Sequence, residues 1–514
     1  MSDYTHEVVD WIRYHALNQP EKLAQVDLAT GRRYSYGQMH ERVGRIAGML
    51  KAHGIKRGDR VGFLALNSTD IMDLIFATWR IGAVSLALNF RLTPGELEFI
   101  INDSTPDFML VDDVFAETAE ALKGMTKVKS WMRFDGIGGD TEFEQAVAQA
   151  TPVMEMEELE PDDQCMLMYS SGTTGRPKGV IITHGMMLWT AINVQVGVGF
   201  TAESVNMSFM PLFHIGGLNV FAVPAAYAGG TSVIMRIVDV GAILDTINDP
   251  DLGVTHFLGV PAIYNGLRQH PKMETTDFSR IEAAFAGAEA VPVELLKWWR
   301  GKGIIVQEGW GMTENCASGT LFRKDDPVEK LGSAGRIGMH SGAKIVREDG
   351  TEAPRGEAGE LWVRGKAVTP GYWKRPEANA ECFVDGWFRT GDIARQDEDG
   401  FFYIEDRVKD MYISGGENVY PAEVENVLYE LPQISEVAVI GLADDKWGEA
   451  GCACVVLKKD QNLTLHEVLV HCKGRLATYK QPAHMVTMSV LPRNATGKVL
   501  KYQLREQAPG LLTS

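Results

Sequence analysis

A loop rich in hydroxyls and glycines, residues 169–179, is the part of this sequence best suited to bind phosphate. It contains four serine and threonine hydroxyls, three glycines and Lys178 within eleven residues. Glycine lets backbone amides approach a ligand closely, hydroxyls donate hydrogen bonds, and lysine adds a cation. The spacing is not that of a Walker loop, Gly-x4-Gly-Lys-Ser/Thr. Taken alone, the loop fits a flexible hairpin turn about as well as a phosphate site.

The string at residues 170–179 resembles the phosphate-loop signature of the adenylate-forming superfamily, which includes acyl-CoA synthetases, peptide-synthetase adenylation domains and luciferases. Four further matches follow in the family's order, at residues 309–314, 387–392, 406–418 and 494–498. The chain is therefore identified as a member of this superfamily. The resemblance implies an AMP-forming acyl-CoA synthetase, a fatty-acid or aryl-acid CoA ligase.

The implied reaction explains which residue types the site needs. A carboxylate that attacks the α-phosphorus of ATP brings two anions together, so catalysis should come from positioning, cations and a metal. Glu314 is the predicted Mg²⁺ ligand, because magnesium favours one or two carboxylates plus phosphate oxygens. The resemblance gives catalytic roles to Thr174 and to Lys498, which would stabilise charge during adenylation. Without the resemblance, Lys498 would be an ordinary solvated lysine. The predicted cofactors are ATP, Mg²⁺ and CoA.

The resemblance also assigns individual contacts to the nucleotide. Thr313 would contact the α-phosphate, and Trp310 would lie against the adenine or the acyl group, at a position where many relatives carry tyrosine. Asp392 would accept hydrogen bonds from both ribose hydroxyls; its ordinary alternative is a turn aspartate. Arg407 would lie near the ribose and phosphates, and its alternative is a surface ion pair. The predicted binding set is Ser170, Ser171, Gly172, Thr173, Thr174, Gly175, Lys178, Gly287, Ala288, Glu289, Trp310, Gly311, Met312, Thr313, Asp392, Arg407, Lys409, Gly415 and Gly416.

Three parts of that set resemble segments with distinct roles. Residues 287–289 resemble the adenine-binding segment, where small residues let a flat base approach the backbone. Lys409 resembles the hinge about which a small domain rotates between half-reactions. Gly415 and Gly416 would line the pantetheine path, where the lack of a β-carbon permits close approach.

The acyl site is predicted from His214 and three other stretches. A lone histidine in an apolar run is more often a core residue, but the resemblance places His214 beside the acyl carboxylate, without a general-base role. The acyl pocket is expected around residues 214–218, 257–260, 286–287 and 311–312. Because these stretches contain no arginine, lysine or aspartate, we expect an apolar monocarboxylic acid. A medium- or long-chain fatty acid and an aryl acid such as a cinnamate both fit.

CoA is the expected acyl acceptor, because residues 414–421 look most like those of acyl- and aryl-CoA ligases and no carrier-protein domain follows. The alternative is a stand-alone adenylation enzyme that loads a carrier protein. A non-catalytic scaffold is disfavoured, because Thr174, Glu314, Asp392 and Lys498 are all present.

Helix-like and strand-like segments alternate through the first half of the chain and would position these motifs. Helices are expected at residues 36–51 and 71–79, and strands at 59–66, 108–111 and 232–235, which predicts an α/β fold with largely parallel sheets. The resemblance implies a large N-terminal domain, residues 1–406, of composite parallel and mixed sheets flanked by helices plus a distorted β-barrel. A small mobile α+β C-terminal domain, residues 407–514, would follow the hinge near Lys409.

Composition limits the partners. The 514 residues include 50 Lys and Arg against 68 Asp and Glu, a net charge of −18, which argues against a nucleic-acid-binding surface. No signal-peptide pattern and no Cys-x-x-Cys pair are visible, so a cytoplasmic location is expected. The charge-free window 209–235 contains two prolines and is expected to be a broken buried segment, not a spanning helix. The expected partners are small molecules, with a homodimer as the one protein partner considered.

Overall fold

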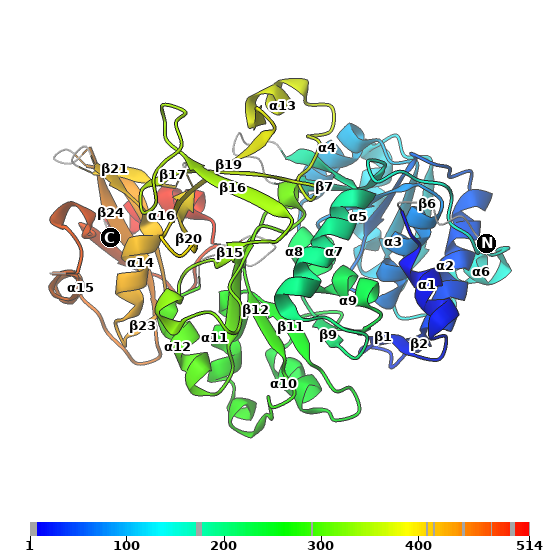
Figure 1. The fold of residues 1–514 in the computed structure, drawn as a ribbon, viewed down its shortest axis with the longest axis horizontal. Helices are drawn as coiled ribbons and strands as arrows, with labels where there is room; N and C mark the ends of the chain where they lie inside the picture. Colours follow the sequence, from blue (N-terminus) through cyan, green and yellow to red (C-terminus); the bar gives the residue numbers. More distant parts are fainter. Residues whose placement is uncertain are drawn as a thin grey trace.

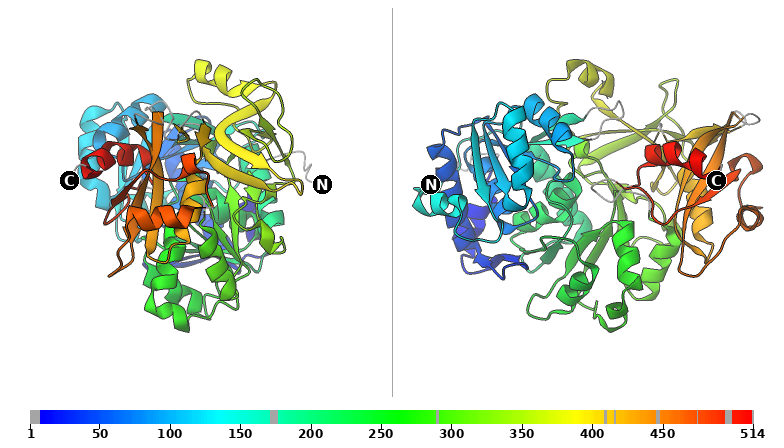
Figure 2. Two further views of the ribbon diagram at one scale, coloured as in Figure 1. Left: turned by 90° about the vertical axis from the view of Figure 1, so that its left-hand side faces the viewer. Right: turned by 180° about the vertical axis from the view of Figure 1, so that it is seen from behind.

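The computed structural model describes residues 8–170, 177–288, 291–407, 410–414, 417–444, 448–473, 475–493 and 499–512 (Figure 1). They form two largely parallel sheets and two largely antiparallel ones. Seen from behind in Figure 2, the first parallel sheet and the last antiparallel sheet lie at opposite ends, with the second parallel sheet between them. The α/β architecture predicted from the sequence is confirmed.

The first parallel sheet has six strands and carries the start of the predicted phosphate loop. Its order is β6-β5-β3-β4-β7-β8, and only the last pair is antiparallel. The strands are mostly buried, as strands covered by helices on both faces are. Strand β7 ends at Ser170, which pairs with Lys178 at the start of β8. The bounds are β3 Arg60–Leu64, β4 Val84–Ala87, β5 Phe108–Asp112, β6 Ser130–Phe134, β7 Gln164–Ser170 and β8 Lys178–Thr183, with helices α1 Trp11–Asn18, α2 Tyr36–Ala52, α3 Thr69–Arg80, α4 Pro94–Ser104, α5 Ala116–Met125 and α6 Glu142–Gln149.

The second parallel sheet has nine strands in the order β15-β14-β13-β12-β11-β9-β10-β1-β2. The carboxyl end of β13 carries Trp310, the first large side chain of the predicted nucleotide site. The bounds are β1 Leu23–Asp27, β2 Arg33–Ser35, β9 Val205–Ser208, β10 Thr231–Ile234, β11 His256–Gly259, β12 Ala283–Ala286, β13 Val306–Trp310, β14 Thr320–Leu321 and β15 Arg336–Ile337, with helices α7 His184–Val198, α10 Val240–Asn248, α11 Pro261–Gln269 and α12 Val293–Gly301.

The charge-free window 209–235 is a broken, buried segment, as predicted. It contains the short helix α8, Ile215–Gly217, a π-helical turn η2, Leu218–Ala222, and α9, Val223–Ala228, before β10. Its apolar residues are almost all buried. Throughout the described part of the chain, no helix is long and apolar enough to cross a bilayer.

The two antiparallel sheets come last in the chain. The first is the half-barrel sheet that was predicted as a distorted β-barrel. It consists of β16 Ser341–Val346, β17 Ala358–Gly365, β18 Phe383–Val384, β19 Trp387–Gln396 and β20 Phe402–Arg407, with α13 Pro376–Cys382 beside it. The second consists of β21 Tyr412–Ser414, β22 Glu417–Val419, β23 Ile434–Asp444, β24 Gly448–Leu457 and β25 His484–Thr487, with α14 Pro421–Tyr429, α15 Leu465–Cys472 and α16 Lys501–Leu512. The predicted hinge, Lys409, lies outside the described residues, and the division at residues 406 and 407 stays a prediction.

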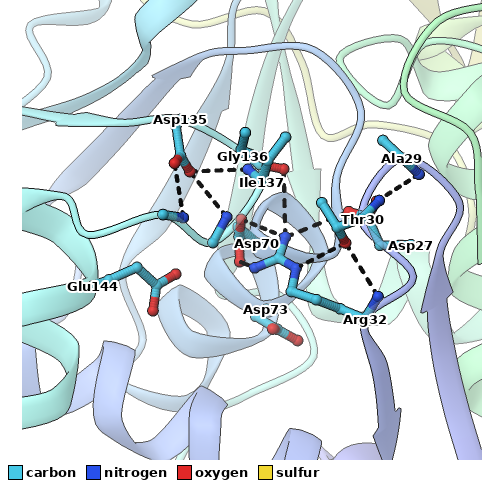
Figure 3. A network of polar contacts seen from close by, with 12 residues as sticks. Asp27, Ala29, Thr30, Arg32, Asp70, Asp73, Asp135, Gly136, Ile137 and Glu144 are labelled. Atoms are coloured by element: carbon cyan, nitrogen blue, oxygen red, sulfur yellow. Dashed lines mark hydrogen bonds and ion pairs between the residues drawn. The ribbon is translucent and has the colours of Figure 1, made fainter.

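A network of buried ion pairs joins the turn before β2 to the helices α2, α3 and α6. Figure 3 shows the contact between Arg32 and Asp70 in this network. Arg42 contacts Asp70 at 2.6 Å, Asp73 at 3.1 Å and Glu144 at 2.6 Å. Arg32 adds a second contact to Asp70 at 3.0 Å. Asp70 and Asp73 are fully buried, and buried carboxylates persist only where such partners compensate their charge. This network is structural.

Candidate active site

The carboxylate of Glu314 lies where the two parallel sheets meet, in the short 3-10 turn η4, Thr313–Asn315. Its side chain is buried. Its Oε1 accepts hydrogen bonds from the Ser170 hydroxyl at 3.2 Å and from the Tyr372 hydroxyl at 2.9 Å. The end of β7 and the turn after β13, far apart in the sequence, are thus brought into contact as the motifs predicted.

Lys178 is linked to the same cluster through an aromatic ring. Its Nζ lies 5.1 Å from the centroid of the Tyr372 ring, a cation–π distance. Burial, reinforced by the Glu314 carboxylate, raises the pKa of the Tyr372 hydroxyl. That hydroxyl therefore stays protonated at neutral pH and donates to Glu314.

The predicted adenine and ribose contacts meet across two sheets. The indole Nε1 of Trp310 donates to Oδ2 of Asp392 at 2.7 Å, and Asp392 is buried. Asp392 lies on β19, and the backbone of Arg407 on β20 is directly opposite it in register. This arrangement leaves the Trp310 ring oriented by a hydrogen bond at its polar edge.

Small residues and strained backbone line the approach to Trp310. Ala288, Cys316 and Ala317 adopt left-handed φ angles of 73°, 57° and 61°, which cost about 1–2 kcal/mol per residue for a non-glycine residue. A β-carbon on Gly311 would lie 2.7 Å from the backbone of Ala317, so only glycine fits there. Strain of this kind gathers at functional sites, where the surrounding structure maintains it.

A cavity of about 650 Å³ lies beside Trp310. One wall is formed by the predicted nucleotide residues, with Ala288, Trp310, Gly311 and Asp392 among them. The opposite wall comes from α14 of the C-terminal sheet. The predicted nucleotide residues Trp310 and Asp392 therefore line a cleft whose other residues include part of α14.

His214 caps the short helix α8 and is half-buried. Its Nδ1 accepts the backbone N–H of Gly216 at 3.1 Å, which leaves the proton of the neutral ring on Nε2. Burial lowers the pKa of His214 to about 4, so the ring is neutral at pH 7. The segment that follows is tied to the Glu314 turn, because Asn219 Nδ2 donates to the Cys316 carbonyl at 3.0 Å.

A second cavity, of about 300 Å³, lies behind the Gly311 turn. Its walls are mostly apolar and come from α7, η2, β12 and the segment after Glu314: Val194, Val198, Val220, Phe221, Phe285, Ala317, Leu321 and Ile337. None of the four predicted acyl stretches lines it. Two of its wall residues lie close to the stretch at 311–312. Ala317 packs against Gly311, and Phe285 packs against Gly309.

Several predicted site residues lie outside the described residues: Ser171, Gly172, Thr173, Thr174, Gly175, Glu289, Lys409, Gly415, Gly416 and Lys498. Their assignments stay predictions, as does the role of the Arg407 side chain. Of the remaining predicted set, Met312 and Thr313 continue from Trp310 and Gly311 into η4.

Tyr372 was not identified from the sequence, although it joins two predicted site residues. A tyrosine carries no charge at neutral pH and lies nearly sixty residues after Glu314. The available signal was the turn-forming string Thr369-Pro370-Gly371 immediately before it. That string marks a loop, and contains nothing that points to Glu314.

The donor set around Glu314 fits Mg²⁺. Over the described ranges, no group of three or more His, Cys, Asp or Glu side chains is placed to hold a metal ion. Magnesium does not need such a cage, because it takes one or two carboxylates together with phosphate oxygens and water. A buried carboxylate beside a phosphate-type loop supplies that kind of site.

Comparison with known proteins supports the same reading. Residues 12–373 match the family model described as AMP-binding enzyme, and residues 423–498 match the AMP-binding enzyme C-terminal domain. A feruloyl-CoA synthase of Amycolatopsis sp is 36% identical over 479 residues, 93% of this chain and 94% of that protein. A long-chain-fatty-acid–CoA ligase of Mycobacterium tuberculosis is 37% identical over 501 residues, 97% and 98% of the two chains.

A solved structure agrees with the fold over almost the whole chain. The crystal structure of ATP-bound MatB from Rhodopseudomonas palustris superimposes with a TM-score of 0.89 at 31% identity, covering 97% of this chain and 98% of that one. The first family model includes Trp310 and Glu314, and the second includes strands β23, β24 and β25 of the C-terminal sheet. This chain belongs to the AMP-binding enzyme family, in the adenylate-forming superfamily of acyl- and aryl-CoA ligases.

Proposed function

We propose that this chain activates an apolar monocarboxylic acid with ATP and transfers the acyl group to CoA. The two relatives named above act, by their names, on an aryl acid and on long-chain fatty acids. Both are apolar acids with a single carboxylate. The AMP-forming ligase activity of the family and the apolar cavity behind Gly311 support this substrate class together.

The single observation that carries the proposal is the lining of that cavity. Its volume of about 300 Å³ lies at the lower end of ligand pockets, which span about 300–1,000 Å³. Its two cationic lining residues, Arg323 and Arg336, are exposed at the outer rim, and Arg336 pairs with Asp326. The other walls are mostly apolar, with Asn193, Ser318 and Thr320 as polar members, so a hydrocarbon or an aryl ring is the group that fits them best.

The chemistry follows in two steps. In the first, a carboxylate oxygen of the acid attacks the α-phosphorus of ATP, and pyrophosphate leaves. In the second, the thiol sulfur of CoA attacks the acyl carbon and AMP leaves. His214 would orient the acid, because its Nε2–H can donate to the carboxylate while Nδ1 is occupied by Gly216.

Charge stabilisation in the first step comes from groups that surround the phosphates. Glu314 would hold Mg²⁺, which when bound neutralises charge on the ATP phosphates. Ser170 and Lys178 lie at the same end of the cleft, and Asp392 would hold the ribose. Lys498 would add a cation during adenylation, so Lys498→Ala should abolish adenylation but leave thioester formation from a supplied acyl-adenylate largely intact.

A panel of carboxylic acids with ATP and CoA, read as AMP release, tests the substrate class. Aryl and fatty monocarboxylates should be turned over with kcat/KM values at least tenfold above those for amino acids and dicarboxylates. Selective turnover of an amino acid would contradict the proposal. Selective turnover of a dicarboxylate would also contradict it and would point to the rim arginines as partners of the second carboxylate.

The cavity itself is tested by Gly197→Ala on α7. An added β-carbon there collides with the Leu321 side chain, which must rotate and narrow the space. We expect kcat/KM for the longest accepted acid to fall about tenfold while acetate-sized acids are unaffected. Gly124→Ala on α5 is the matched control, because a β-carbon there meets open space. Equal kcat/KM for long acids in both variants would show that the acyl group lies elsewhere.

The acceptor is tested separately. AMP release that depends on CoA distinguishes the proposed ligase from an enzyme that loads a carrier protein. Absence of ATP–pyrophosphate exchange with every acid would instead support the scaffold alternative. A cytoplasmic location and a homodimer stay predictions from the sequence.

A further inference from the structure

The segment from Thr369 to Trp373 forms a short seam along the outer edge of β8. The Ile181 N–H donates to the Gly371 carbonyl at 3.1 Å, and the Trp373 N–H donates to the Gly179 carbonyl at 2.7 Å. Val180 and Tyr372 form an antiparallel bridge between these bonds. The seam therefore fixes the backbone of Tyr372 against the strand that begins with Lys178.

The inner end of the seam holds the Glu314 turn at two points. The Thr369 N–H donates to the Glu314 carbonyl at 2.7 Å, and the Tyr372 hydroxyl donates to Oε1 of the same residue at 2.9 Å. Tyr372 is 7% exposed. Main chain and side chain of Glu314 are thus positioned by residues three apart in one extended segment.

The outer end of the seam is anchored to two helices. The Tyr372 N–H donates to Asn379 Oδ1 at 2.7 Å, and Asn379 Nδ2 donates back to the Tyr372 carbonyl at 3.3 Å. On the other side, Asp103 of α4 accepts from Arg375 at 2.8 Å and from the Tyr169 hydroxyl at 2.6 Å. Because both ends are held, Tyr372 has little freedom to move.

We infer that Tyr372 is a positioning residue that sets the Glu314 carboxylate and the Lys178 ammonium for the ATP phosphates and their cation. This rests on the proposed function only in identifying ATP as the nucleotide. The hydroxyl fixes the orientation of the carboxylate before a cation arrives, and the ring limits where the ammonium can lie. Removing a group that orients a metal-binding side chain commonly lowers the metal affinity about 10–100-fold.

Tyr372→Phe separates the hydroxyl from the ring. It removes the hydrogen bond to Glu314 and keeps the aromatic face beside Lys178. We expect the Mg²⁺ concentration that half-saturates ATP–pyrophosphate exchange to rise about tenfold, with the KM for the carboxylic acid unchanged. Tyr372→Leu, which also removes the ring, should add a rise in the KM for ATP.

Calorimetric titration of ATP into the enzyme, without any acid, provides a readout that does not depend on turnover. At limiting Mg²⁺, the Kd for ATP should rise about tenfold in Tyr372→Phe, and in excess EDTA the Kd values of variant and wild type should coincide. If the wild type binds ATP with Mg²⁺ but exchanges pyrophosphate with no acid, the proposed function fails while this titration still tests Tyr372.

Tyr36→Phe is the matched control, because it also removes a buried hydroxyl, one that donates to the Gly230 carbonyl at 2.7 Å away from the site. It should leave both Mg²⁺ curves unchanged. Asn379→Ala, which loosens the outer anchor, should shift them in the same direction as Tyr372→Phe by a smaller factor. Superimposable Mg²⁺ curves for Tyr372→Phe and wild type, or an equal shift in Tyr36→Phe, would overturn the inference.

Discussion

Two buried carboxylate clusters in this molecule are held in different ways. In the network of α2, α3 and α6, the guanidinium of Arg42 contacts three carboxylates and that of Arg32 reaches a shared one. At the nucleotide cleft, the contacts described above for Glu314 Oε1 come from the neutral hydroxyls of Ser170 and Tyr372. The partners named in the first cluster are guanidiniums, whereas the two named for Glu314 Oε1 are hydroxyls that direct the carboxylate.

The difference separates stability from function. In the network, the loss of one guanidinium leaves buried carboxylates without that partner. The Ser170 and Tyr372 hydroxyls orient the Glu314 carboxylate, and an oriented carboxylate can act on a bound cation. Variants in the two clusters should therefore affect different measurements.

Arg42→Met should give the largest effect, on stability. It removes the guanidinium partner of Asp73 and Glu144 and leaves Asp70 with Arg32, and breaking a buried pair costs about 3–5 kcal/mol. Urea unfolding measures the loss, and ATP–pyrophosphate exchange of the folded protein should stay within twofold of wild type. Arg45→Met, which breaks an exposed pair with Glu41 on the same helix, should cost less than about 1 kcal/mol. Equal losses in the two variants would remove the distinction between the clusters.

Glu314→Gln should give the next largest effect, on activity. The substitution keeps the shape and removes the charge, so we expect exchange to fall about 10²–10³-fold, about 3–4 kcal/mol of transition-state stabilisation. The free energy of unfolding should change by less than about 1 kcal/mol. A variant that unfolds easily while still exchanging at the wild-type rate would place Glu314 with the structural carboxylates.

Trp310→Phe should have a moderate effect on nucleotide binding. It removes the N–H that donates to Asp392 at 2.7 Å, a hydrogen bond to a charged group worth about 1.5–3 kcal/mol. The Kd for ATP should rise about tenfold, read by calorimetry. Trp131→Phe, which loses an indole bond to the Val128 carbonyl in the first sheet, is the control and should bind ATP normally. An unchanged Kd in Trp310→Phe would mean that Asp392 needs no orientation from the indole.

Glu308→Gln should be visible in the pH dependence of stability. Burial raises the pKa of Glu308 to about 8, so the folded chain holds a proton that the unfolded chain has released near pH 4.5. The wild type should therefore lose stability as pH rises from about 5 to about 8, by at most about 1.4 kcal/mol per unit. In Glu308→Gln this component disappears, so the stability of the wild type relative to the variant should fall as pH rises from about 5 to about 8. A difference that grows in the opposite direction would show that Glu308 is ionised in the fold.

The sequence predicted the architecture because the relevant signals are local. The alternation of apolar strands and amphipathic helices predicted the parallel sheets, and the motifs named Glu314, Trp310 and Asp392 as candidate site residues, whose roles stay predictions. The contacts between motifs could not be foreseen, since they depend on which loops the sheets bring together. The Trp310–Asp392 bond joins residues 82 positions apart.

Tyr372 and the 300 Å³ cavity were missed for the same reason. Tyr372 acquires its role from the register between its segment and β8, which no periodicity encodes. The cavity is formed by α7, η2, β12 and the Glu314 turn together, so its position depends on how four segments pack. The predicted acyl stretches lie near the expected position of the acyl carboxylate, where motifs identify residues. They do not include the far wall of the cavity, which no motif marks.

The seam at Tyr372 has a further consequence for the physical behaviour of the chain. Without it, β8 would end the six-stranded sheet with a row of open amides and carbonyls, and such an edge is a template for pairing with another chain. The backbone bonds of Gly371 and Trp373 to β8 close that edge. The segment that contacts Glu314 therefore also protects this edge of the sheet from strand addition and aggregation.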